Sequence, residues 1–499
     1  MFKRILISNR GEIAVRIMRA ARELGVETVA VFHSVDKEMP FVHYADYAWE
    51  LTSETPKAGY LDISQIIELA HKSGAEAIHP GYGFLSENAK FSQACIDAGI
   101  KFIGPKPHAI EVMGSKTKAR ELMAAAGVPI VPGTKEKITD MNRLHEIANE
   151  LVYPVLLKAA SGGGGKGMRK VSSPNELESC FESASREALK SFGDDSIYIE
   201  KYIENPKHIE IQIIADEHGN YVHLGERDCS VQRRHQKLIE ESPSTVLDES
   251  LRYKMGEVAI AAAKACNYVN AGTIEFLFDK HKNFYFLEMN TRLQVEHPVT
   301  ELVTGFDLAK EQIRIAAGEK LSFTQSDVTW KGHAIECRIN AEDPFNDFMP
   351  DTGKIKYLRE PAGKGIRCDS GVESGSTISI YFDSMLAKLI AYGRNRQEAI
   401  ERMEQALMNY RIKGIKTVIP FHLAVMRHEQ FRAGSFDTGF IEQVFDFDSF
   451  KKIKDEFAEV IAAITAAGYL KAKAQAQPER RKPKQSKWKD YRFISRRLF

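Results

Sequence analysis

Cysteine is scarce in this chain, with six cysteines among 499 residues and no CxxC pair. Small secreted domains held by disulfides carry a denser and more regular set of cysteines. The sequence therefore predicts no disulfide framework and a reduced, cytoplasmic location. Apolar runs long enough to cross a membrane are also missing. The short apolar run that follows Met1 is expected to be a first strand and not a signal peptide.

Net charge is also nearly absent, because 69 Lys and Arg face 68 Asp and Glu and give +1. The net charge is too small to create an electrostatic field that would attract nucleic acid or an acidic membrane, so we expect neither as a partner. The balance hides a local bias, since nine Lys and Arg but only two Asp and Glu fall within residues 479–499. The other residues hold 60 basic and 66 acidic side chains, a net charge of −6. The basic character is thus confined to a tail.

The dinucleotide-binding fingerprint is missing from the first βαβ unit. Residues 4–8 predict a buried strand, residues 11–24 an amphipathic helix and residues 28–32 a second strand. The turn at residues 9–12 holds one glycine, where a GxGxxG sequence would normally bind the pyrophosphate of NAD. We therefore expect a structural Rossmann-like layer with a parallel sheet and no NAD site.

A glycine-rich loop follows the strand predicted at residues 154–158, but it is not a Walker A loop. That motif needs Ser or Thr after its lysine, whereas Lys166 precedes Gly167. Successive glycines expose backbone N–H groups that can close over phosphate oxygens, and Lys116 and Lys158 each offer a point charge. The alternative is a flexible surface loop. The candidate phosphate-binding residues of the loop are Gly163, Gly164, Gly165, Lys166, Gly167 and Met168.

A predicted hairpin with strands at residues 271–278 and 284–289 carries one glutamate on each strand. Counting back from the five-residue loop places Glu275 opposite position 287 or 288, depending on a bulge. Carboxylates as close as cross-strand neighbours repel each other unless a cation lies between them. Mg²⁺ with ATP phosphates fits this arrangement, with Glu275, Glu288 and Asn290 as candidate ligands. A solvated hairpin is the alternative, which the large apolar flanking residues disfavour.

A polar string directly follows this hairpin. Arg292, Gln294 and a backbone N–H are suited to holding a small planar oxyanion, with Glu296 placed as a base. A second polar cluster spans residues 229–237, and Arg338 lies in a third. Each cluster alone is compatible with a surface strand. Several polar clusters inside apolar strands need partners, so together they favour a functional site.

The sequence resembles biotin carboxylase, the ATP-grasp component of biotin-dependent carboxylases, over roughly residues 1–445. The motifs that carry the resemblance are Ser8–Ala14, His79–Asn88, Gly162–Met168, Glu226–Ser230, Gln232–Lys237, Glu288–Pro298 and Glu336–Pro344. The resemblance implies an α/β fold in three domains followed by a tail. The implied parts are a Rossmann-like domain at 1–114, an ATP-grasp domain at 115–330 with a mobile lid at about 131–203, an α+β biotin carboxylase C-terminal domain at 331–446, and a helix and basic tail at 447–499.

The resemblance also assigns roles residue by residue. It implies ATP-phosphate contacts from the glycine-rich loop and from Lys116, Lys158 and His208. It implies an adenine pocket of Glu200, Lys201, Ile203 and Leu277, with Gln232 and His235 near the nucleotide. The implied ligands of Mg²⁺ or Mn²⁺ are Glu275, Glu288 and Asn290, and the implied bicarbonate site is Lys237, Arg292, Gln294 and Val295. Glu296 resembles the general base and Arg338 the residue that stabilises the biotin enolate. Lys166 stands where some members carry Arg, which keeps the charge.

The implied activity is ATP-dependent carboxylation of biotin by bicarbonate through carboxyphosphate, the first half-reaction of a biotin-dependent carboxylase. A biotinyl lysine lies in a Met-Lys-Met context, which this sequence lacks, and few residues follow position 445. We therefore expect the chain to work with biotin on a separate carrier protein and with a separate carboxyltransferase subunit. The resemblance also implies a homodimer. Acetyl-CoA, propionyl-CoA, pyruvate and other 2-oxo acids all remain open as final acceptors.

Other interpretations remain open beside this one. A different ATP-grasp carboxylase or ligase would lack the runs at 292–298 and 336–344, and a non-catalytic scaffold subunit would have lost some of the Lys, Glu and Arg set. Cys229 is expected to be structural, because the mechanism has no step for a thiolate.

In the tail, the sequence predicts a helix at 451–467, and the aromatic residues of 488–494 suggest a docking segment, with a disordered terminus as the alternative.

Overall fold

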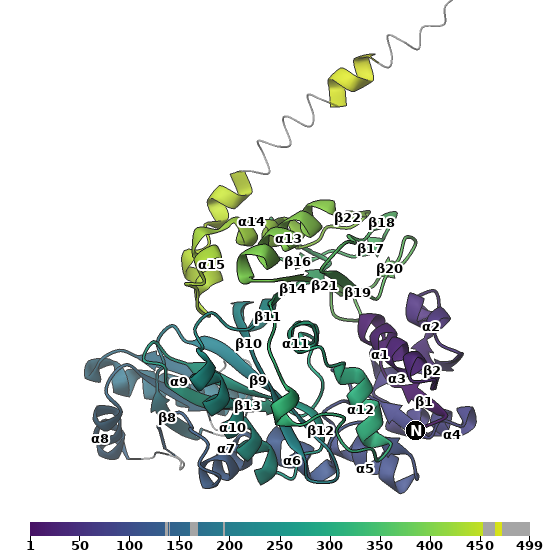
Figure 1. The fold of residues 1–499 in the computed structure, drawn as a ribbon. Helices are drawn as coiled ribbons and strands as arrows, with labels where there is room; N and C mark the ends of the chain where they lie inside the picture. The colour runs from purple at the N-terminus through teal and green to yellow at the C-terminus, as the bar shows by residue number, and fades with distance from the viewer. Residues whose placement is uncertain (135–137, 139, 160–167, 193–194, 453–464, 472–499) are drawn as a thin grey trace, which may run out of the picture. The chain divides into compact units, whose positions relative to one another are not determined.

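We describe the fold from a computed structural model of the chain, covering residues 1–134, 138, 140–159, 168–192, 195–452 and 465–471. The chain divides into two compact units, residues 1–444 and 445–499 (Figure 1). In the second unit, residues 447–452 and 465–471 are helical. Most of the helical face predicted at 451–467 lies outside the described residues. The loop residues Gly163, Gly164, Gly165, Lys166 and Gly167 also lie outside them.

A five-stranded parallel sheet forms the N-terminal region, with strand order β3-β2-β1-β4-β5. Alternate side chains of the central strand β1 serve different cores: Ile5 and Ile7 pack in one cluster and Leu6 in another. This burial on both faces is typical of a parallel sheet covered by helices, and it confirms the predicted βαβ unit. The strands are β1 (Arg4–Ile7), β2 (Glu27–His33), β3 (Tyr47–Leu51), β4 (Ala77–His79) and β5 (Lys101–Phe102).

The helices of this region follow the predicted periodicity. Ile13 and Ile17 of the first helix are buried against the sheet. Asp62 and Asn88 cap α4 and α5, accepting hydrogen bonds from the backbone N–H groups of Gln65 and Phe91. The helices are α1 (Gly11–Glu23), α2 (Pro40–Tyr44), α3 (Pro56–Tyr60), α4 (Ile63–Ser73), α5 (Ala89–Asp97), α6 (Pro107–Gly114) and α7 (Lys116–Ala125).

An antiparallel sheet of eight strands, in the order β13-β12-β9-β10-β11-β14-β21-β19, forms the centre of the first unit. The β11–β14 pair carries this sheet across position 330, where the sequence predicts a domain boundary. The strands are β9 (Lys207–Ala215), β10 (Tyr221–Arg233), β11 (Gln236–Ser242), β12 (Asn270–Phe278), β13 (Phe284–Asn290), β14 (His333–Asn340), β19 (Ile366–Ser370) and β21 (Met385–Gly393).

Strand β10 is longer than the sequence analysis expects. The apolar residues at 221–226 predict a strand that ends at Glu226, where a run of polar residues begins, but β10 continues to Arg233. The polar residues continue the strand because they find buried partners. Asp228, for example, forms an ion pair with Lys207 at 2.9 Å.

Helices cover the large sheet on both sides. Helix α10 packs against β9 and β10, α11 against β10, β11 and β14, and α13 against β14 and β21, while α12 packs against α1 and β12. Helix α11 begins directly after the polar string of the predicted site. The helices are α10 (Glu249–Ala265), α11 (His297–Thr304), α12 (Leu308–Ala316), α13 (Arg396–Asn409), α14 (Ile419–Arg427) and α15 (Glu429–Ala433).

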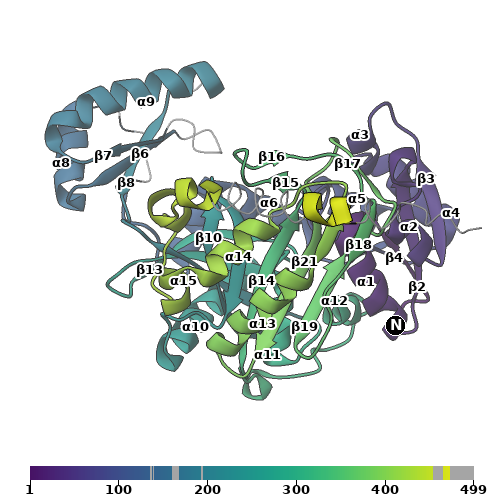
Figure 2. The same ribbon diagram turned by 90° about the horizontal axis from the view of Figure 1, so that it is seen from above.

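A small sheet of three antiparallel strands, β7-β6-β8, lies within the range expected for the lid. It has its own core, in which Val155, Leu157 and Ile199 are fully buried. Figure 2 shows this sheet beside its two helices. The elements are α8 (Met141–Leu151), β6 (Val155–Ala159), β7 (Met168–Val171), α9 (Leu177–Phe192) and β8 (Ile197–Lys201).

Three two-stranded sheets complete the first unit. They are the pairs β15–β16, β17–β20 and β18–β22. Their strands are β15 (Glu342–Asp343), β16 (Met349–Pro350), β17 (Gly353–Lys354), β18 (Tyr357–Arg359), β20 (Thr377–Ile378) and β22 (Arg411–Lys413). These features confirm the predicted α/β class with a parallel N-terminal sheet. Among the described residues, no helix combines the length and the apolar character needed to cross a bilayer.

Candidate active site

Polar side chains cover one face of the central sheet. In β9, His208, Glu210 and Gln212 alternate with isoleucines, and every residue of the strand is buried. Successive side chains of a strand point to opposite faces, so the isoleucines pack in the core under α10 and the polar residues share the other face. Buried polar groups need partners, and the neighbouring strands supply them.

Lys237 of β11 lies at the centre of this polar face. Its Nζ is 2.6 Å from Glu210 Oε2, 2.8 Å from Glu275 Oε1 and 2.7 Å from Glu296 Oε1. Burial by itself lowers the pKa of this ammonium, but the three carboxylates outweigh it and raise the pKa well above its usual value. Lys237 is therefore permanently charged and joins strands β9, β11 and β12 to the loop before α11.

Two of the carboxylates around Lys237, those of Glu296 and Glu275, are ionised for the same reason. Burial would raise the pKa of Glu296, but Lys237, Arg338 and Arg227 lower it well below its usual value. The pKa of Glu275 is likewise lowered by Lys237, and next by His208, against the effect of burial. At neutral pH both groups are proton acceptors and not donors.

Arg227 of β10 holds the polar face together, with a side chain that is 0% exposed. It forms an ion pair with Glu210 and donates to Gln294 Oε1 at 2.7 Å. Since Gln294 belongs to the loop before α11, this arginine ties the loop to the sheet. Its other acceptors are Gln212 Oε1 at 2.7 Å, Thr300 Oγ1 at 3.0 Å and Thr273 Oγ1 at 3.1 Å.

The predicted carboxylate pair is present on the β12–β13 hairpin. Glu275 and Glu288 are register partners, and the expected irregularity follows directly between Glu275 and Phe276. Glu275 is buried, whereas Glu288 opens to solvent. Partial desolvation and the neighbouring Glu275 carboxylate raise the pKa of Glu288. Two facing carboxylates with an amide oxygen nearby, from Asn290, form the hard oxygen donor set that Mg²⁺ or Mn²⁺ prefers.

A second group of possible ligands is already occupied by a cation of the protein. Ligand atoms of His208, Glu210 and Glu275 lie within 4.8 Å of one another. Lys237 is paired with both carboxylates of this group, and His208 Nε2 lies 2.9 Å from Glu275 Oε2. A divalent ion fits better on the Glu288 side of the hairpin, where the lysine does not reach the second carboxylate.

The loop between β13 and α11 presents the residues of the predicted oxyanion site. Arg292 is fixed by Glu87 Oε2 at 3.0 Å and by Asn290 Oδ1 at 3.0 Å. Gln294 donates to Glu275 Oε1 at 2.9 Å, and Val295 is half-buried between Gln294 and Glu296. Arg292 and Gln294 are thus both held beside Glu275, Gln294 directly and Arg292 through Asn290.

Arg338 of β14 connects this loop to the next part of the sheet. Its Nη2 donates to Glu296 Oε2 at 2.9 Å and its Nε to Glu240 Oε1 at 2.6 Å. Burial lowers the pKa of the guanidinium, but Glu240 and Glu296 outweigh it and raise the pKa. Glu296 is therefore held on one oxygen by Lys237 and on the other by Arg338.

The candidate ATP residues lie on separate elements. Lys116 is the first residue of α7, and Lys158 of β6 forms an ion pair with Glu200 Oε2 at 2.6 Å. Glu200 also pairs with Arg120, so it is bridged by two cations. The ammonium of Lys201 donates to the Val152 carbonyl at 2.5 Å. Ile203, just after β8, and Met168, in β7, are both partly exposed.

The remaining nucleotide candidates lie on the central sheet. Leu277 is the register partner of His208, and Gln232 is the register partner of Lys237. His235 occupies the tight turn between β10 and β11 with a φ of 64°. Leu277 and Gln232 are thus paired with two residues of the polar face, and His235 lies at the end of the β10–β11 hairpin.

Several residues of the site were missed by the sequence analysis. Glu210 and Arg227 form the buried centre of the network, while Glu87 and Glu240 fix the two arginines. A signal for Glu210 exists, because polar residues at every second position of an isoleucine-rich strand are unusual on a solvated face. Arg227 and Glu87 lie inside motifs that carry the family resemblance, at 226–230 and 79–88, but no role was assigned to them. Glu240 has no signal of its own, since its partner Arg338 is remote in sequence. Cys229 lies close to Glu210 and Glu296, and burial raises the pKa of its thiol well above the usual value, as a structural thiol requires.

Three protein families match successive parts of the chain. Residues 1–110 match the biotin carboxylase N-terminal domain, residues 115–324 the carbamoyl-phosphate synthase L chain ATP binding domain, and residues 336–443 the biotin carboxylase C-terminal domain. Together these matches cover most of the sequence.

Whole proteins and solved structures resemble the chain over nearly the same range. It is 53% identical both to biotin carboxylase 1 of Bacillus subtilis and to the biotin carboxylase of a Nostoc species. Each match spans 443 residues, which is 89% of this chain and 98% and 99% of the respective relative. The dimeric biotin carboxylase domain of Hydrogenobacter thermophilus 2-oxoglutarate carboxylase, solved with MgADP and bicarbonate, superposes with a TM-score of 0.82. It is 48% identical, and the match covers 89% of this chain and 98% of that one.

Proposed function

The chain belongs to the biotin carboxylase family, and from this premise we propose how its residues carry out the ATP-dependent carboxylation of biotin. Bicarbonate is a poor electrophile, so the reaction first converts it to carboxyphosphate at the expense of ATP. The carboxyl group then passes to N1 of biotin. These two steps together form the first half-reaction of a biotin-dependent carboxylase.

Nucleotide binding is assigned to Lys116 of α7 and to residues in or beside the β7-β6-β8 sheet and the central sheet. Lys116, Lys158 and His208 hold ATP phosphates together with the glycine-rich loop, and Glu200, Lys201, Ile203 and Leu277 line the adenine site, with Gln232 and His235 near the nucleotide. Glu275, Glu288 and Asn290 would hold Mg²⁺ or Mn²⁺, and the bound ion would offset the negative charge of the transferring phosphoryl group. Closure of the lid excludes water, which would hydrolyse carboxyphosphate.

The bicarbonate step is assigned to the loop before α11 and to Lys237. Arg292, Gln294 and the Val295 N–H orient bicarbonate, and Lys237 offsets its charge. Glu296 accepts the bicarbonate proton while the oxygen that carried it attacks the γ-phosphorus of ATP. The bond between the γ-phosphorus and the β–γ bridging oxygen breaks, and ADP and carboxyphosphate are formed.

The biotin step is assigned to Arg338 and Glu296. Removal of the N1 proton places negative charge on the ureido oxygen of biotin, and the permanent charge of Arg338 stabilises that enolate. After the proton taken from bicarbonate has left Glu296, the same carboxylate accepts the N1 proton. N1 then attacks the carboxyl carbon, and inorganic phosphate leaves.

The observation that carries this proposal is the buried chain Lys237–Glu296–Arg338, with distances of 2.7 and 2.9 Å. One ionised carboxylate is held between the cation assigned to bicarbonate and the cation assigned to biotin. The test is ADP release by the purified chain with ATP, Mg²⁺ and bicarbonate, with and without free biotin. Stimulation by biotin supports the proposal, whereas an ATPase that is indifferent to biotin and to a biotinylated carrier contradicts it.

The partners are part of the same proposal. Biotin is carried by a separate biotin carboxyl carrier protein, a separate carboxyltransferase subunit uses the product, and the chain forms a homodimer. In support, the biotin carboxylases of Bacillus subtilis and Nostoc are matched over 98% and 99% of their own length, and the Hydrogenobacter relative crystallised as a dimer. The basic, aromatic tail serves as a docking segment for the complex. Deletion of residues 470–499 is expected to weaken co-purification with the partners and to spare turnover of free biotin, and intact assembly would contradict the docking role.

A further inference from the structure

The two peptide groups that flank Val295 are each held by a buried side chain. The carbonyl of Gln294 accepts a hydrogen bond from His297 Nδ1 at 2.7 Å. The carbonyl of Val295 itself accepts one from Lys388 Nζ at 3.1 Å. The side chains of His297 and Lys388 are both 0% exposed, and neither belongs to the residues assigned to substrates above.

The chemistry of His297 fixes its proton on the nitrogen that faces the loop. A carbonyl oxygen only accepts, so Nδ1 must carry the hydrogen. Burial, and then the positive charges of Lys388, Arg16 and Arg367, lower the pKa of His297 well below its usual value. The ring is therefore neutral, and its Nε2 has no hydrogen-bond partner among the described residues. This histidine therefore contributes one hydrogen bond, which its Nδ1–H donates to the Gln294 carbonyl.

Lys388 is fixed from its other side by the N-terminal region. Its ammonium lies 3.2 Å from Glu12 Oε2, and Tyr82 also donates a hydrogen bond to that carboxylate. Glu12 is in the first turn of α1, close to the backbone of Gly371. A Cβ on Gly371 would lie 2.4 Å from the Glu12 nitrogen, so only glycine permits this approach.

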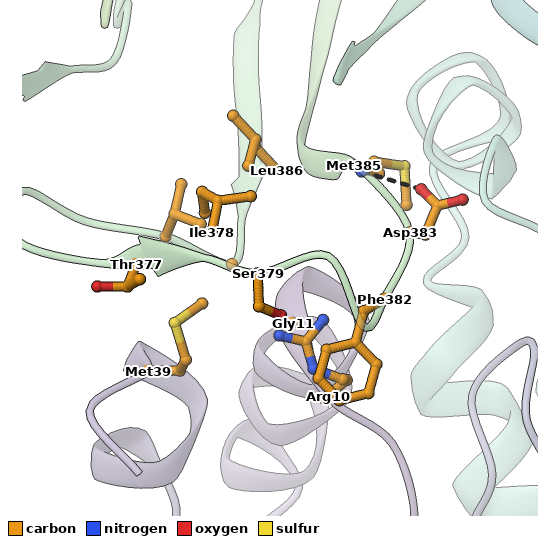
Figure 3. A pocket seen from close by; sticks show the side chains of 12 residues that line it. Arg10, Gly11, Met39, Thr377, Ile378, Ser379, Phe382, Asp383, Met385 and Leu386 are labelled. Carbon is orange, nitrogen blue, oxygen red and sulfur yellow. Dashed lines mark hydrogen bonds between the residues drawn. The ribbon is translucent and has the colours of Figure 1, made fainter. Parts of the chain in front are cut away.

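Arg10 anchors the start of α1 in the same place. Figure 3 shows its side chain beside Phe382, and the guanidinium lies 4.0 Å from the ring centroid. Arg10 also forms an ion pair with Asp36 at 2.7 Å. The position of Glu12, and through it that of Lys388, is thus set by contacts between the N-terminal helix and the loop before β21.

Holding the two carbonyls determines where the loop points its hydrogen-bonding groups. In a planar trans peptide, the C=O and the following N–H point in opposite directions. His297 therefore sets the direction of the Val295 N–H, and Lys388 sets the peptide plane that leads into Glu296. We propose that His297 and Lys388 are positioning residues that aim the Val295 N–H at bicarbonate and the Glu296 carboxylate at its proton. This inference rests on the proposed function.

A matched pair of substitutions at His297 tests the hydrogen bond. Asn places its side-chain N–H close to the position of Nδ1, whereas Gln places it near Nε2, away from the carbonyl. We expect His297→Gln to raise the KM for bicarbonate about tenfold or more, the cost of one misaimed donor. His297→Asn is expected to keep this KM within about twofold of the wild type, and neither change alters the KM for ATP.

Lys388 is tested against a control that breaks an equally buried ion pair elsewhere. Lys388→Met removes the bond to Val295 and leaves Glu12 unpaired. Arg252→Met leaves the buried Glu226 without its partner at 2.7 Å but touches no residue of the loop. Both variants are expected to unfold at a lower temperature, and only Lys388→Met is expected to raise the KM for bicarbonate.

The readout is bicarbonate-dependent ADP release at varied bicarbonate and fixed saturating ATP. Equal bicarbonate KM values for His297→Asn and His297→Gln would overturn the inference. A Lys388→Met enzyme whose KM for bicarbonate equals that of the Arg252→Met control would also overturn it. If Lys388→Met does not fold, the two His297 variants decide. A wild-type chain whose ADP release ignores bicarbonate would refute the proposed function itself, which keeps the two failures distinct.

Discussion

Glu240 of β11 and Glu336 of β14 are register partners, and both side chains are fully buried. Burial and the Glu296 carboxylate raise the pKa of Glu240 to about 7, although Arg338 pairs with one of its oxygens. Burial, followed by the Glu240 charge, raises the pKa of Glu336 well above the usual value, although Lys388 opposes it. Neither oxygen of Glu336 has a hydrogen-bond partner among the described residues. The pair therefore keeps a proton on Glu336 at neutral pH.

We expect Glu336→Gln to leave the protein as stable as the wild type at pH 5 and more stable at pH 8. A raised carboxyl pKa gives stability that is complete below the unfolded pKa of about 4.3 and is lost as the pH rises through the folded pKa. A neutral amide does not incur that loss. Thermal unfolding of both proteins between pH 5 and pH 8 measures the difference in stability. Between the unfolded and the folded pKa, the wild type should lose about 1.4 kcal/mol relative to the variant for each pH unit. A variant that is less stable than the wild type at pH 8 would contradict this protonation state.

Glu241, the next residue of β11, is expected to behave in the opposite way. Burial would raise its pKa, but Arg396 at 2.8 Å and His333 at 3.2 Å outweigh it and lower the pKa to about 2. A depressed pKa gives stability that is present above the unfolded pKa and is lost as the pH falls through about 2. Glu241→Gln should therefore cost roughly 3 kcal/mol near pH 7, and the difference should shrink in acid. Urea unfolding at pH 7 and pH 3 provides the comparison, and an equal loss at both values would exclude the ion-pair explanation.

Arg338→Ala is expected to abolish the stimulation of ADP release by biotin. Loss of the charge that stabilises an oxyanion lowers turnover by about a hundredfold or more, while nucleotide binding does not involve this residue. The measurement is turnover of free biotin together with the KM for ATP. Arg427→Ala is the control, since it removes a surface ion pair with Glu404 at 2.7 Å. Unchanged biotin turnover in Arg338→Ala would remove this arginine from the mechanism.

Glu288→Gln is expected to raise the Mg²⁺ concentration needed for half-maximal ADP release by about tenfold or more. Even groups outside the ligand shell change metal affinity by 10–100-fold, and a lost carboxylate also removes one charge facing Glu275. Titration with Mg²⁺ after treatment with EDTA measures the effect, with Glu257→Gln on the exposed side of α10 as the control. The metal assignment fails if both variants need the same Mg²⁺ concentration as the wild type.

Cys229→Ala is expected to retain activity. The thiol is fully buried and its pKa is raised well above the usual value, so it does not form a nucleophilic thiolate. The small cavity should lower the stability by about 1 kcal/mol. Assays of ADP release and of the unfolding temperature separate the two effects, and a loss of activity without a loss of stability would assign the thiol a chemical role.

Local patterns in the sequence determined the elements whose partners are near in the chain. The strand at residues 4–8, the helix at 11–24 and the hairpin at 271–289 follow from apolar periodicity and loop length, which narrowed the partner of Glu275 to position 287 or 288. Family membership also follows from the sequence, because long motifs carry it. These features depend on contacts within about thirty residues, which the order of residue types constrains directly.

Only the tertiary structure decided which charges meet. Lys237 binds carboxylates from β9, β12 and the loop before α11, and no sequence pattern predicts that three acids up to 59 positions away surround one lysine. The extension of β10 to Arg233, the sheet that crosses position 330, and the contact of Lys388 with Val295 have the same origin. Each depends on the free energy of burying polar groups, which becomes favourable only when the remote partner is in place.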